Sequence, residues 1–219
     1  MIEIQNLCLT LDKKEILRDI NVTLEDGKIH GLVGRNGSGK TMLMKCMCGF
    51  VRVTSGQIRI QDKVVGRDID IPDNMGIILE TPGFIPYYNG YKNLKLLANL
   101  RRKIKPETIE KYMELVGLDA KSKLAVRKYS LGMRQRLGIA QALMEQPDIL
   151  ILDEPFNGLD KEGVAEMRAV LSNIKGEGRT IILASHNAQD IEILCDKVYE
   201  IENGKLAVKK DISVTDSVI

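Results

Sequence analysis

Residues 34–41 read Gly34-Arg35-Asn36-Gly37-Ser38-Gly39-Lys40-Thr41. This stretch fits the pattern G-x-x-x-x-G-K-[ST] of a phosphate-binding loop, which requires a strand before it and a helix after it. The apolar run Ile29–Val33 predicts that strand, and Thr41–Phe50 predicts the helix. Glycines let backbone N–H groups approach a phosphate without interference from Cβ atoms, and a helix N-terminus adds partial positive charge. Lys40 can reach the β- and γ-phosphates of a nucleotide, and the Thr41 hydroxyl can ligate Mg²⁺. The structural alternative is a glycine-rich turn with an exposed lysine, and the complete pattern disfavours it.

A second candidate site follows the apolar run 149–152, where the chain reads Asp153-Glu154-Pro155. Pro155 cannot continue a strand ladder, and strand ends are where α/β folds place ligand-binding groups. Taken alone, two acidic residues after a strand are more often a solvated turn. Together with the phosphate loop, they predict that Asp153 holds Mg²⁺ through water and that Glu154 acts as a general base toward an attacking water.

Two weaker signals lie at Ser185-His186 and at Ser130. If the strand Thr180–Ala184 neighbours the strand that ends at Asp153, His186 can donate a hydrogen bond to a γ-phosphate or hold the attacking water. A histidine after a strand is otherwise more often structural. Ser130 precedes a predicted helix that starts near Met133, so it can help to bind an anion or can simply cap that helix.

The order of predicted elements indicates an α/β fold with a helical insert. The first third is rich in β-structure, residues 91–144 show helical spacing, and the last third alternates strands with helices. A turn across Asn203-Gly204 predicts a terminal hairpin. The predicted strands are Ile2–Leu9, Asn21–Leu24, Ile29–Val33, Ile58–Ile60, Met75–Leu79, Ile149–Leu152, Thr180–Ala184, Lys197–Ile201 and Lys205–Val208, and the predicted helices of the last third are Lys161–Ile174 and Ala188–Leu194.

The charge balance and the lack of long apolar runs exclude some classes of protein. The 219 residues carry a formal charge of +2, from 32 basic and 30 acidic residues, which argues against a nucleic-acid site built on bulk charge. No apolar run approaches the roughly 18 to 20 residues of a membrane-spanning helix, and the N-terminus lacks the pattern of a secretory signal. We therefore expect a cytoplasmic protein, in which the four cysteines are reduced and mostly buried.

The phosphate loop, the turn around Ser130, the Asp153-Glu154 strand end, the loop before Asp160 and Ser185-His186 occur in one order. This arrangement resembles the nucleotide-binding subunit of ATP-binding cassette (ABC) transporters over nearly the whole chain. The resemblance implies a P-loop NTPase core of the ABC type, with an antiparallel β subdomain and an inserted helical subdomain. It divides a single domain, 1–219, into an α/β core of residues 1–80 and 146–219 and a helical subdomain of residues 81–145.

On this resemblance, Ser130 and Gly132 match the family's signature motif, Asp160 matches its D-loop and His186 matches its switch histidine. The resemblance implies a subunit that binds ATP and Mg²⁺ and hydrolyses the ATP to power transport through separate transmembrane permease subunits. It also implies an ATP-dependent, head-to-tail dimer with a second ABC ATPase subunit, expected to be a copy of this chain. The protein would lie peripherally on the cytoplasmic face of the cell membrane, with no nucleic acid expected.

Two alternatives remain at this point. A soluble ABC-type ATPase that acts on nucleic acid or on the ribosome shares the nucleotide motifs, but it usually has clustered basic residues that the near-neutral charge does not indicate. A small P-loop kinase explains neither Ser130 and Gly132 nor Ser185-His186.

Three positions depart from the family pattern. Leu131 replaces a glycine of the signature motif, and Glu80 stands where the Q-loop glutamine is expected. A carboxylate at Glu80 can bind Mg²⁺ more strongly than an amide, but it also lies near the charge of the γ-phosphate. The aromatic residue that stacks on adenine is replaced by an aliphatic one, which we place at Leu11. The variants at Glu80 and Leu131 resemble the bacitracin and lantibiotic self-protection branch, whose ATPases drive export of antimicrobial peptides.

A docking surface for a partner is expected at the helical subdomain and at Thr81–Tyr91, an uncharged stretch that contains Phe84, Tyr87 and Tyr88. Exposed aromatic side chains favour partner anchoring, whereas a packed loop is the alternative.

Overall fold

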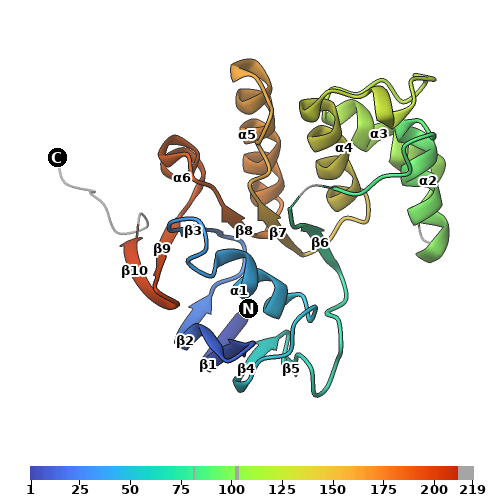
Figure 1. Ribbon diagram of the computed structural model, residues 1–219. Helices are drawn as coiled ribbons and strands as arrows, with labels where there is room; N and C mark the ends of the chain where they lie inside the picture. The colour runs from blue at the N-terminus through green and yellow to red at the C-terminus, as the bar shows by residue number, and fades with distance from the viewer. Residues whose placement is uncertain (81, 102–103, 212–219) are drawn as a thin grey trace.

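Two β-sheets organise the chain, as Figure 1 shows for the computed structural model, which describes residues 1–80, 82–101 and 104–211. The smaller sheet is antiparallel, with the strand order β2-β1-β4-β5. Its members are β1 (Ile2–Leu11), β2 (Lys14–Leu24), β4 (Ser55–Ile60) and β5 (Lys63–Val64). Buried side chains recur on one face of β1 and β2, as expected for a sheet with one face on the core and one on solvent.

The larger sheet has six strands in the order β10-β9-β3-β8-β7-β6. Its strands are β3 (Ile29–Val33), β6 (Met75–Ile78), β7 (Ile149–Asp153), β8 (Thr180–Ala184), β9 (Lys197–Glu202) and β10 (Lys205–Asp211). All pairs are parallel except the terminal hairpin of β9 and β10. Every residue of β7 and β8 is buried, because helices or the smaller sheet cover both faces.

The alternation of side chains along β7 shows the two halves of the core. Ile149 and Ile151 face a cluster that contains the smaller sheet and α1 (Lys40–Met47), whereas Leu150 and Leu152 face the other helices. Helix α1 therefore lies between the two sheets, as Figure 1 shows. The opposite face is covered by α5 (Lys161–Gly176), α6 (Ala188–Leu194) and the helices that follow β6.

Between β6 and β7 the chain forms α2 (Gly90–Arg101), α3 (Pro106–Leu115), the short 3₁₀ helix η1 (Val126–Lys128) and α4 (Leu131–Leu143). Pro106 begins α3, where its missing N–H group costs no helical hydrogen bond. Helix α4 packs against β6, and α2 and α3 lie outside α4 (Figure 1). Within the described residues, no helix combines the length and the apolar character needed to span a bilayer.

The predicted α/β class is confirmed, and β3, β8 and α6 have the predicted bounds. Strand β2 begins at Lys14 rather than at Asn21, since its polar first half pairs with β1 through a tight turn at Asp12 and Lys13, both at positive φ. Helix α1 ends at Met47 rather than at Phe50, because Gly49 adopts φ +76° and cannot continue a right-handed helix.

The four cysteines are free, and Cys46, Cys48 and Cys195 are buried as expected. Burial raises the pKa of each of these three thiols to about 12. They therefore remain neutral thiols near pH 7 and act as small apolar side chains.

Candidate functional site

Three strands of the larger sheet bring the predicted site residues to one edge. Strand β3 leads into the phosphate loop, β7 ends at Asp153, and β8 is followed by Ser185 and His186. Strand β8 pairs in parallel with both β3 and β7, so the carboxyl ends of all three strands lie together. The condition on which His186 was predicted to join the site, that its strand neighbours the one ending at Asp153, is confirmed.

The phosphate loop is shaped by glycines at positions where a side chain does not fit. Gly34 adopts φ +150°, and a Cβ atom there would lie 2.3 Å from the carbonyl oxygen of Ile201. The Lys40 ammonium group donates to the carbonyl oxygens of Gly34 at 2.7 Å and Arg35 at 3.2 Å. This cation is therefore held over the turn that precedes α1.

The hydroxyl of Ser38 in the same loop is buried and has no hydrogen-bond partner in the described part of the chain. A buried hydroxyl without a partner is costly, so such a group marks a place for a ligand or water. The first N–H groups of α1 likewise have no acceptor inside the helix. The loop thus offers a cation, a hydroxyl and backbone donors to an anion.

Thr41 and Asp153 meet beside this loop. The Thr41 hydroxyl donates to Asp153 Oδ2 at 2.6 Å, and the Asp153 side chain is buried at the end of β7. A hydroxyl and a carboxylate together form an oxygen donor set that suits a small divalent cation.

Glu154 and His186 form the next pair along the edge. Glu154 Oε2 lies 2.8 Å from His186 Nδ1. Glu154 adopts φ +51°, where the chain turns out of β7, and its backbone is held from two sides. Its N–H donates to the Ala184 carbonyl oxygen at 2.9 Å, and its own carbonyl oxygen accepts from Gln135 Nε2 at 3.3 Å. The backbone of Glu154 is therefore anchored beside β8, and its side chain is 24% exposed.

A cavity of about 660 Å³ connects the phosphate loop to Thr41, Asp153 and Glu154. This volume suits a nucleotide-sized ligand. Its lining residues are Ile16, Asn36, Gly37, Gly39, Lys40, Thr41, Met42, Glu80, Leu131, Gln135, Asp153, Glu154 and Asn157. His186 and Arg35 lie at the neighbouring cavity on the far side of the loop.

The sequence did not single out Ile16, Gln135 or Asn157. Ile16 belongs to the first half of β2, which was not predicted as a strand. Leu11, predicted as the aliphatic contact for adenine, lies at the exposed end of β1 and is not among the residues that line this cavity. Gln135 is a polar side chain at a buried position of α4, which is a signal that a helical pattern could have revealed.

Glu80 lines the cavity, but its carboxylate is held at the rim. Glu80 Oε1 lies 2.7 Å from Lys45 Nζ, on the last turn of α1. The Glu80 side chain is 66% exposed and that of Lys45 is 26% exposed. The carboxylate thus has a cationic partner of its own at the edge of the site.

The turns around Ser130 and Asp160 lie next to each other. Ser130 Oγ accepts from the Met133 N–H at 3.1 Å, and Asp160 Oδ1 accepts from the Gly163 N–H at 2.8 Å, so each side chain caps a helix. A Cβ atom on Gly132 would lie 2.7 Å from the Gly158 carbonyl oxygen, so only glycine permits this approach. Ser130, Gly132 and Asp160 are not among the residues that line the 660 Å³ cavity.

Comparison with known proteins decides between the functions that this geometry allows. Residues 17–157 match the family model described as "ABC transporter".

The chain belongs to the ABC transporter family.

This ABC subunit is 41% identical over 215 residues to the bacitracin transport ATP-binding protein BcrA of Enterococcus faecalis, covering 97% of this chain and 70% of the relative. It is 38% identical over 213 residues to the lantibiotic transport ATP-binding protein SrtF of Streptococcus pyogenes, covering 96% of this chain and 91% of the relative. The dimeric structure of the ATP-binding cassette MJ0796, in a post-hydrolysis state bound to ADP and Pi, shares its fold at 17% identity with a TM-score of 0.87, covering 97% and 99% of the two chains.

The chain is thus the ATP-binding and ATP-hydrolysing subunit of an ABC transporter. The family and its relatives support this function over that of an ABC-type ATPase that acts on nucleic acid or on the ribosome.

Proposed function

We propose that this chain hydrolyses Mg-ATP in the 660 Å³ cavity and thereby powers export of a peptide antibiotic through a separate transmembrane permease. The observation that carries the proposal is the Glu154–His186 pair beside the phosphate loop, because it sets a base at the place where a γ-phosphate would lie. The overall reaction joins ATP and water to give ADP and phosphate.

The residues of the cavity fit Mg-ATP. Lys40 and the backbone donors of the loop match the charge of the β- and γ-phosphates, and the partnerless Ser38 hydroxyl is a further donor. Thr41 and Asp153 would hold Mg²⁺, the former directly and the latter through water. When bound, Mg²⁺ neutralises negative charge that develops on the phosphates. Ile16 of β2 offers an aliphatic surface to the base.

Glu154 takes the role of general base. Its carboxylate accepts a proton from the attacking water as the water oxygen forms a bond to the γ-phosphorus and the bond to the β-phosphate oxygen breaks. His186 orients Glu154 through their 2.8 Å contact, which fixes the direction of the proton-accepting oxygen. The Gln135 side chain steadies the same residue from its carbonyl side.

A second subunit completes the site. Ser130, Gly132 and Asp160 lie away from the cavity of their own chain, although Ser130 begins a helix whose free N–H groups attract an anion. We therefore assign these residues to the nucleotide of a second copy, with the two copies arranged head to tail. ATP then lies between two subunits and favours the dimer.

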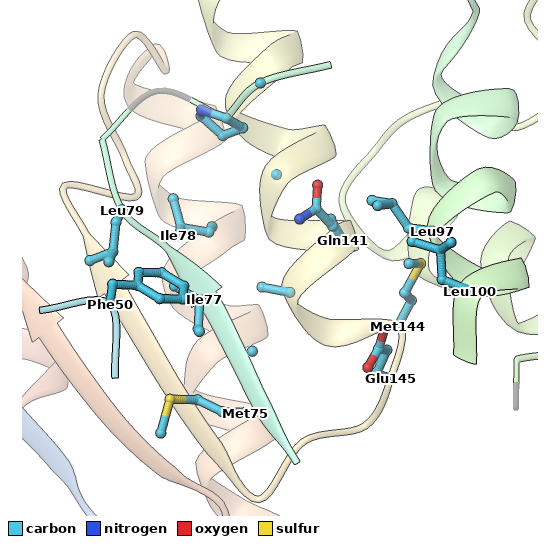
Figure 2. A pocket seen from close by; sticks show the side chains of 15 residues that line it. Phe50, Met75, Ile77, Ile78, Leu79, Leu97, Leu100, Gln141, Met144 and Glu145 are labelled. Atoms are coloured by element: carbon cyan, nitrogen blue, oxygen red, sulfur yellow. The ribbon is translucent and has the colours of Figure 1, made fainter. Parts of the chain in front are cut away.

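The transmembrane permease docks in a groove of about 460 Å³ beside β6. Figure 2 shows Phe50, Ile77 and Leu79 on one side of this groove and Leu97, Leu100 and Met144 on the other. Phe50 is 53% exposed and Leu100 is 80% exposed, so the rim presents large apolar side chains to a partner. A short apolar helix from the permease fits a groove of this size and lining.

Consecutive residues connect this groove to the nucleotide. Leu79 lines the groove and Glu80 lines the ATP cavity, so a displacement of one by the permease moves the other. Of the docking stretch predicted from the sequence, Pro82 and Gly83 line the groove, whereas Thr81 lies outside the described residues. Phe84 is instead packed against the core.

The names of the relatives support the proposed cargo and location. BcrA and SrtF are named for bacitracin and lantibiotic transport, which supports export of an antimicrobial peptide or a similar drug-like compound. The chain would then work on the cytoplasmic face of the cell membrane, held there by its permease.

Glu154→Gln tests the proposal, because it retains the shape of the side chain but removes the base. We expect ATP binding to persist, turnover to fall by about a thousandfold or more, and an ATP-dependent dimer to accumulate on gel filtration. Glu162→Gln, an exposed change in the first turn of α5, serves as the control and retains normal turnover. Undiminished hydrolysis by Glu154→Gln would remove this residue from the mechanism.

Leu100→Asp tests the groove. We expect it to abolish co-purification with the permease while leaving the ATPase activity of the isolated subunit intact. Leu96→Asp, on the same helix but outside the groove lining, is the matched control. Equal loss of permease binding in both variants would argue against the groove as the docking site.

A further inference from the structure

The charge of this protein is unevenly distributed along the chain. Residues 81–145 contain 13 of the 32 Lys and Arg residues but only 5 of the 30 Asp and Glu residues, which gives this part a formal charge of +8. The remainder carries −6. The near-neutral total therefore conceals a strongly basic helical region, and the nucleotide site does not use this charge.

Two segments of the helical region meet where α2 begins (Figure 1). The Val126 N–H donates to the Tyr88 carbonyl oxygen at 2.8 Å, and the Arg127 N–H donates to that of Pro86 at 2.9 Å. Asn89 Nδ2 donates to the Ser122 carbonyl oxygen at 2.8 Å. Neither residues 82–106 nor residues 120–144 contain an acidic residue. The junction therefore combines basic side chains from both segments without acidic neighbours inside those ranges.

Exposed aromatic and basic side chains gather at this junction, and we name them the basic-aromatic surface. It consists of Tyr87, Tyr88, Lys92, Lys121, Lys123 and Arg127. The two rings are 75% and 41% exposed. Arg127 lies 5.5 Å from the centre of the Tyr87 ring, and Lys92 lies 5.9 Å from that of Tyr88. Within the part of the chain that the structure describes, none of the four cations forms an ion pair.

We propose that the basic-aromatic surface binds the headgroups of anionic phospholipids. Tyrosine rings favour the boundary between water and acyl chains, and clustered Lys and Arg residues bind the negatively charged cytoplasmic leaflet. Because these cations form no ion pair, they lose no internal carboxylate partner when they meet a phosphate. The surface thus gives the subunit a membrane contact of its own, in addition to the permease.

The position of the surface agrees with this partner. Helix α2 contributes Lys92 to the basic-aromatic surface and Leu97 and Leu100 to the groove proposed for the permease. A permease lies within the bilayer, so a surface on the same helix as its docking groove lies near the lipid headgroups. Only this orientation rests on the proposed function, since binding of the isolated chain to vesicles does not require a permease.

A nucleic acid would use the same cations but would stack its bases on open rings, whereas both rings here are engaged by cations.

Co-sedimentation of the full chain with vesicles tests the proposal. We expect binding to vesicles of phosphatidylglycerol mixed with phosphatidylcholine, little binding to pure phosphatidylcholine, and weakening as the salt concentration rises. Each basic residue near an anionic surface strengthens binding by about fivefold, so a variant with four cations replaced by glutamine should bind several hundredfold more weakly. The four changes are Lys92→Gln, Lys121→Gln, Lys123→Gln and Arg127→Gln.

The matched control removes four exposed cations from the antiparallel half of the molecule, by Lys13→Gln, Lys14→Gln, Arg52→Gln and Lys63→Gln. The control and test variants have the same total charge. If the control keeps its vesicle binding, the loss of binding in the test variant is due to the basic-aromatic surface and not to the lower net charge. Both variants should retain the far-ultraviolet circular dichroism and the ATPase activity of the parent chain, which keeps this test separate from that of Glu154.

Three results would overturn the proposal. The first is no preference for phosphatidylglycerol, and the second is equal loss of vesicle binding in the test and control variants. The third is a test variant that keeps its vesicle binding but loses binding to an oligonucleotide, which would assign the surface to nucleic acid.

Discussion

Leu131 and Gly158 form a contact that links the signature turn to the loop before Asp160. A Cβ atom on Gly158 would lie 2.4 Å from Leu131 Cγ and 2.5 Å from Leu131 Cδ2. Gly158 also adopts φ +77°, in the left-handed region. The leucine that departs from the family pattern thus occupies the space beside a glycine, and Gly158→Ala should disturb both partners.

The expected cost of Gly158→Ala has two parts. Placing alanine at a left-handed position costs about 1–2 kcal/mol. Forcing an extra carbon against Leu131 adds up to about 1 kcal/mol, the low end of the cost of overpacking, because Leu131 is 47% exposed and can shift. The free energy of unfolding should therefore fall by about 1–3 kcal/mol. Gly178→Ala provides the control, because Gly178 has φ +85° and no atom lies within 4 Å of the added Cβ. This variant should therefore lose only the stability that corresponds to placing alanine in the left-handed region.

Urea unfolding followed by circular dichroism measures these differences. Adding Leu131→Ala to Gly158→Ala removes the two closest atoms, so the double variant should recover most of the packing part. If Gly158→Ala costs no more than Gly178→Ala, or if Leu131→Ala gives no recovery, the contact does not have the energy assigned to it.

Three further predictions concern a buried histidine, an ion pair and the four cysteines. Burial lowers the pKa of His30 below its ordinary value of 6.5, so as the pH falls the unfolded chain takes up a proton before the folded chain does. The free energy of unfolding should therefore be unaffected by His30 above about pH 6.5 and should fall as the pH drops below it. In His30→Gln, urea unfolding at about pH 7.5 and about pH 5.5 should lack this contribution to the difference in stability. A double-mutant cycle with Lys45→Met and Glu80→Gln should give a coupling of about 0.5 kcal/mol in the free energy of unfolding. This value is modest because Glu80 is largely exposed, and a coupling of zero would contradict a stabilising ion pair. A thiol reagent should label at most Cys8 in the native protein and all four cysteines after unfolding; rapid labelling of a second native thiol would contradict the burial of the others.

Much of the larger sheet could be predicted from the sequence, because its strands are short apolar runs followed by chemically distinctive residues. Ile29–Val33 and Thr180–Ala184 were predicted with their observed bounds for this reason. The first half of β2 was not predicted, since its polar residues face solvent and the strand depends on pairing with β1. Ile16, rather than Leu11, lines the cavity, and it belongs to this half of β2 that the sequence pattern did not indicate.

The central site residues were predictable because each follows a strand end in a distinctive local pattern. Their mutual geometry was not, since the contact of Glu154 with His186 depends on the order of strands in the sheet. The pairing of Glu80 with Lys45 joins residues 35 positions apart, and no local pattern indicates it. Leu131 likewise acquires its partner, Gly158, only because the start of α4 packs against the loop before Asp160.

The affinity of a Lys40→Ala variant for ATP tests whether residues 34–41 bind the phosphates of ATP. It is measured by equilibrium binding, with Glu154→Gln present in both chains to prevent turnover. Lys40 contributes a charge-assisted hydrogen bond of about 1.5–3 kcal/mol, so the dissociation constant should rise by about tenfold to a hundredfold. Lys63→Ala, an exposed change in β5, should leave it unchanged. An unchanged dissociation constant for Lys40→Ala would contradict the assignment of residues 34–41 as the phosphate-binding loop, and with it the account of the site.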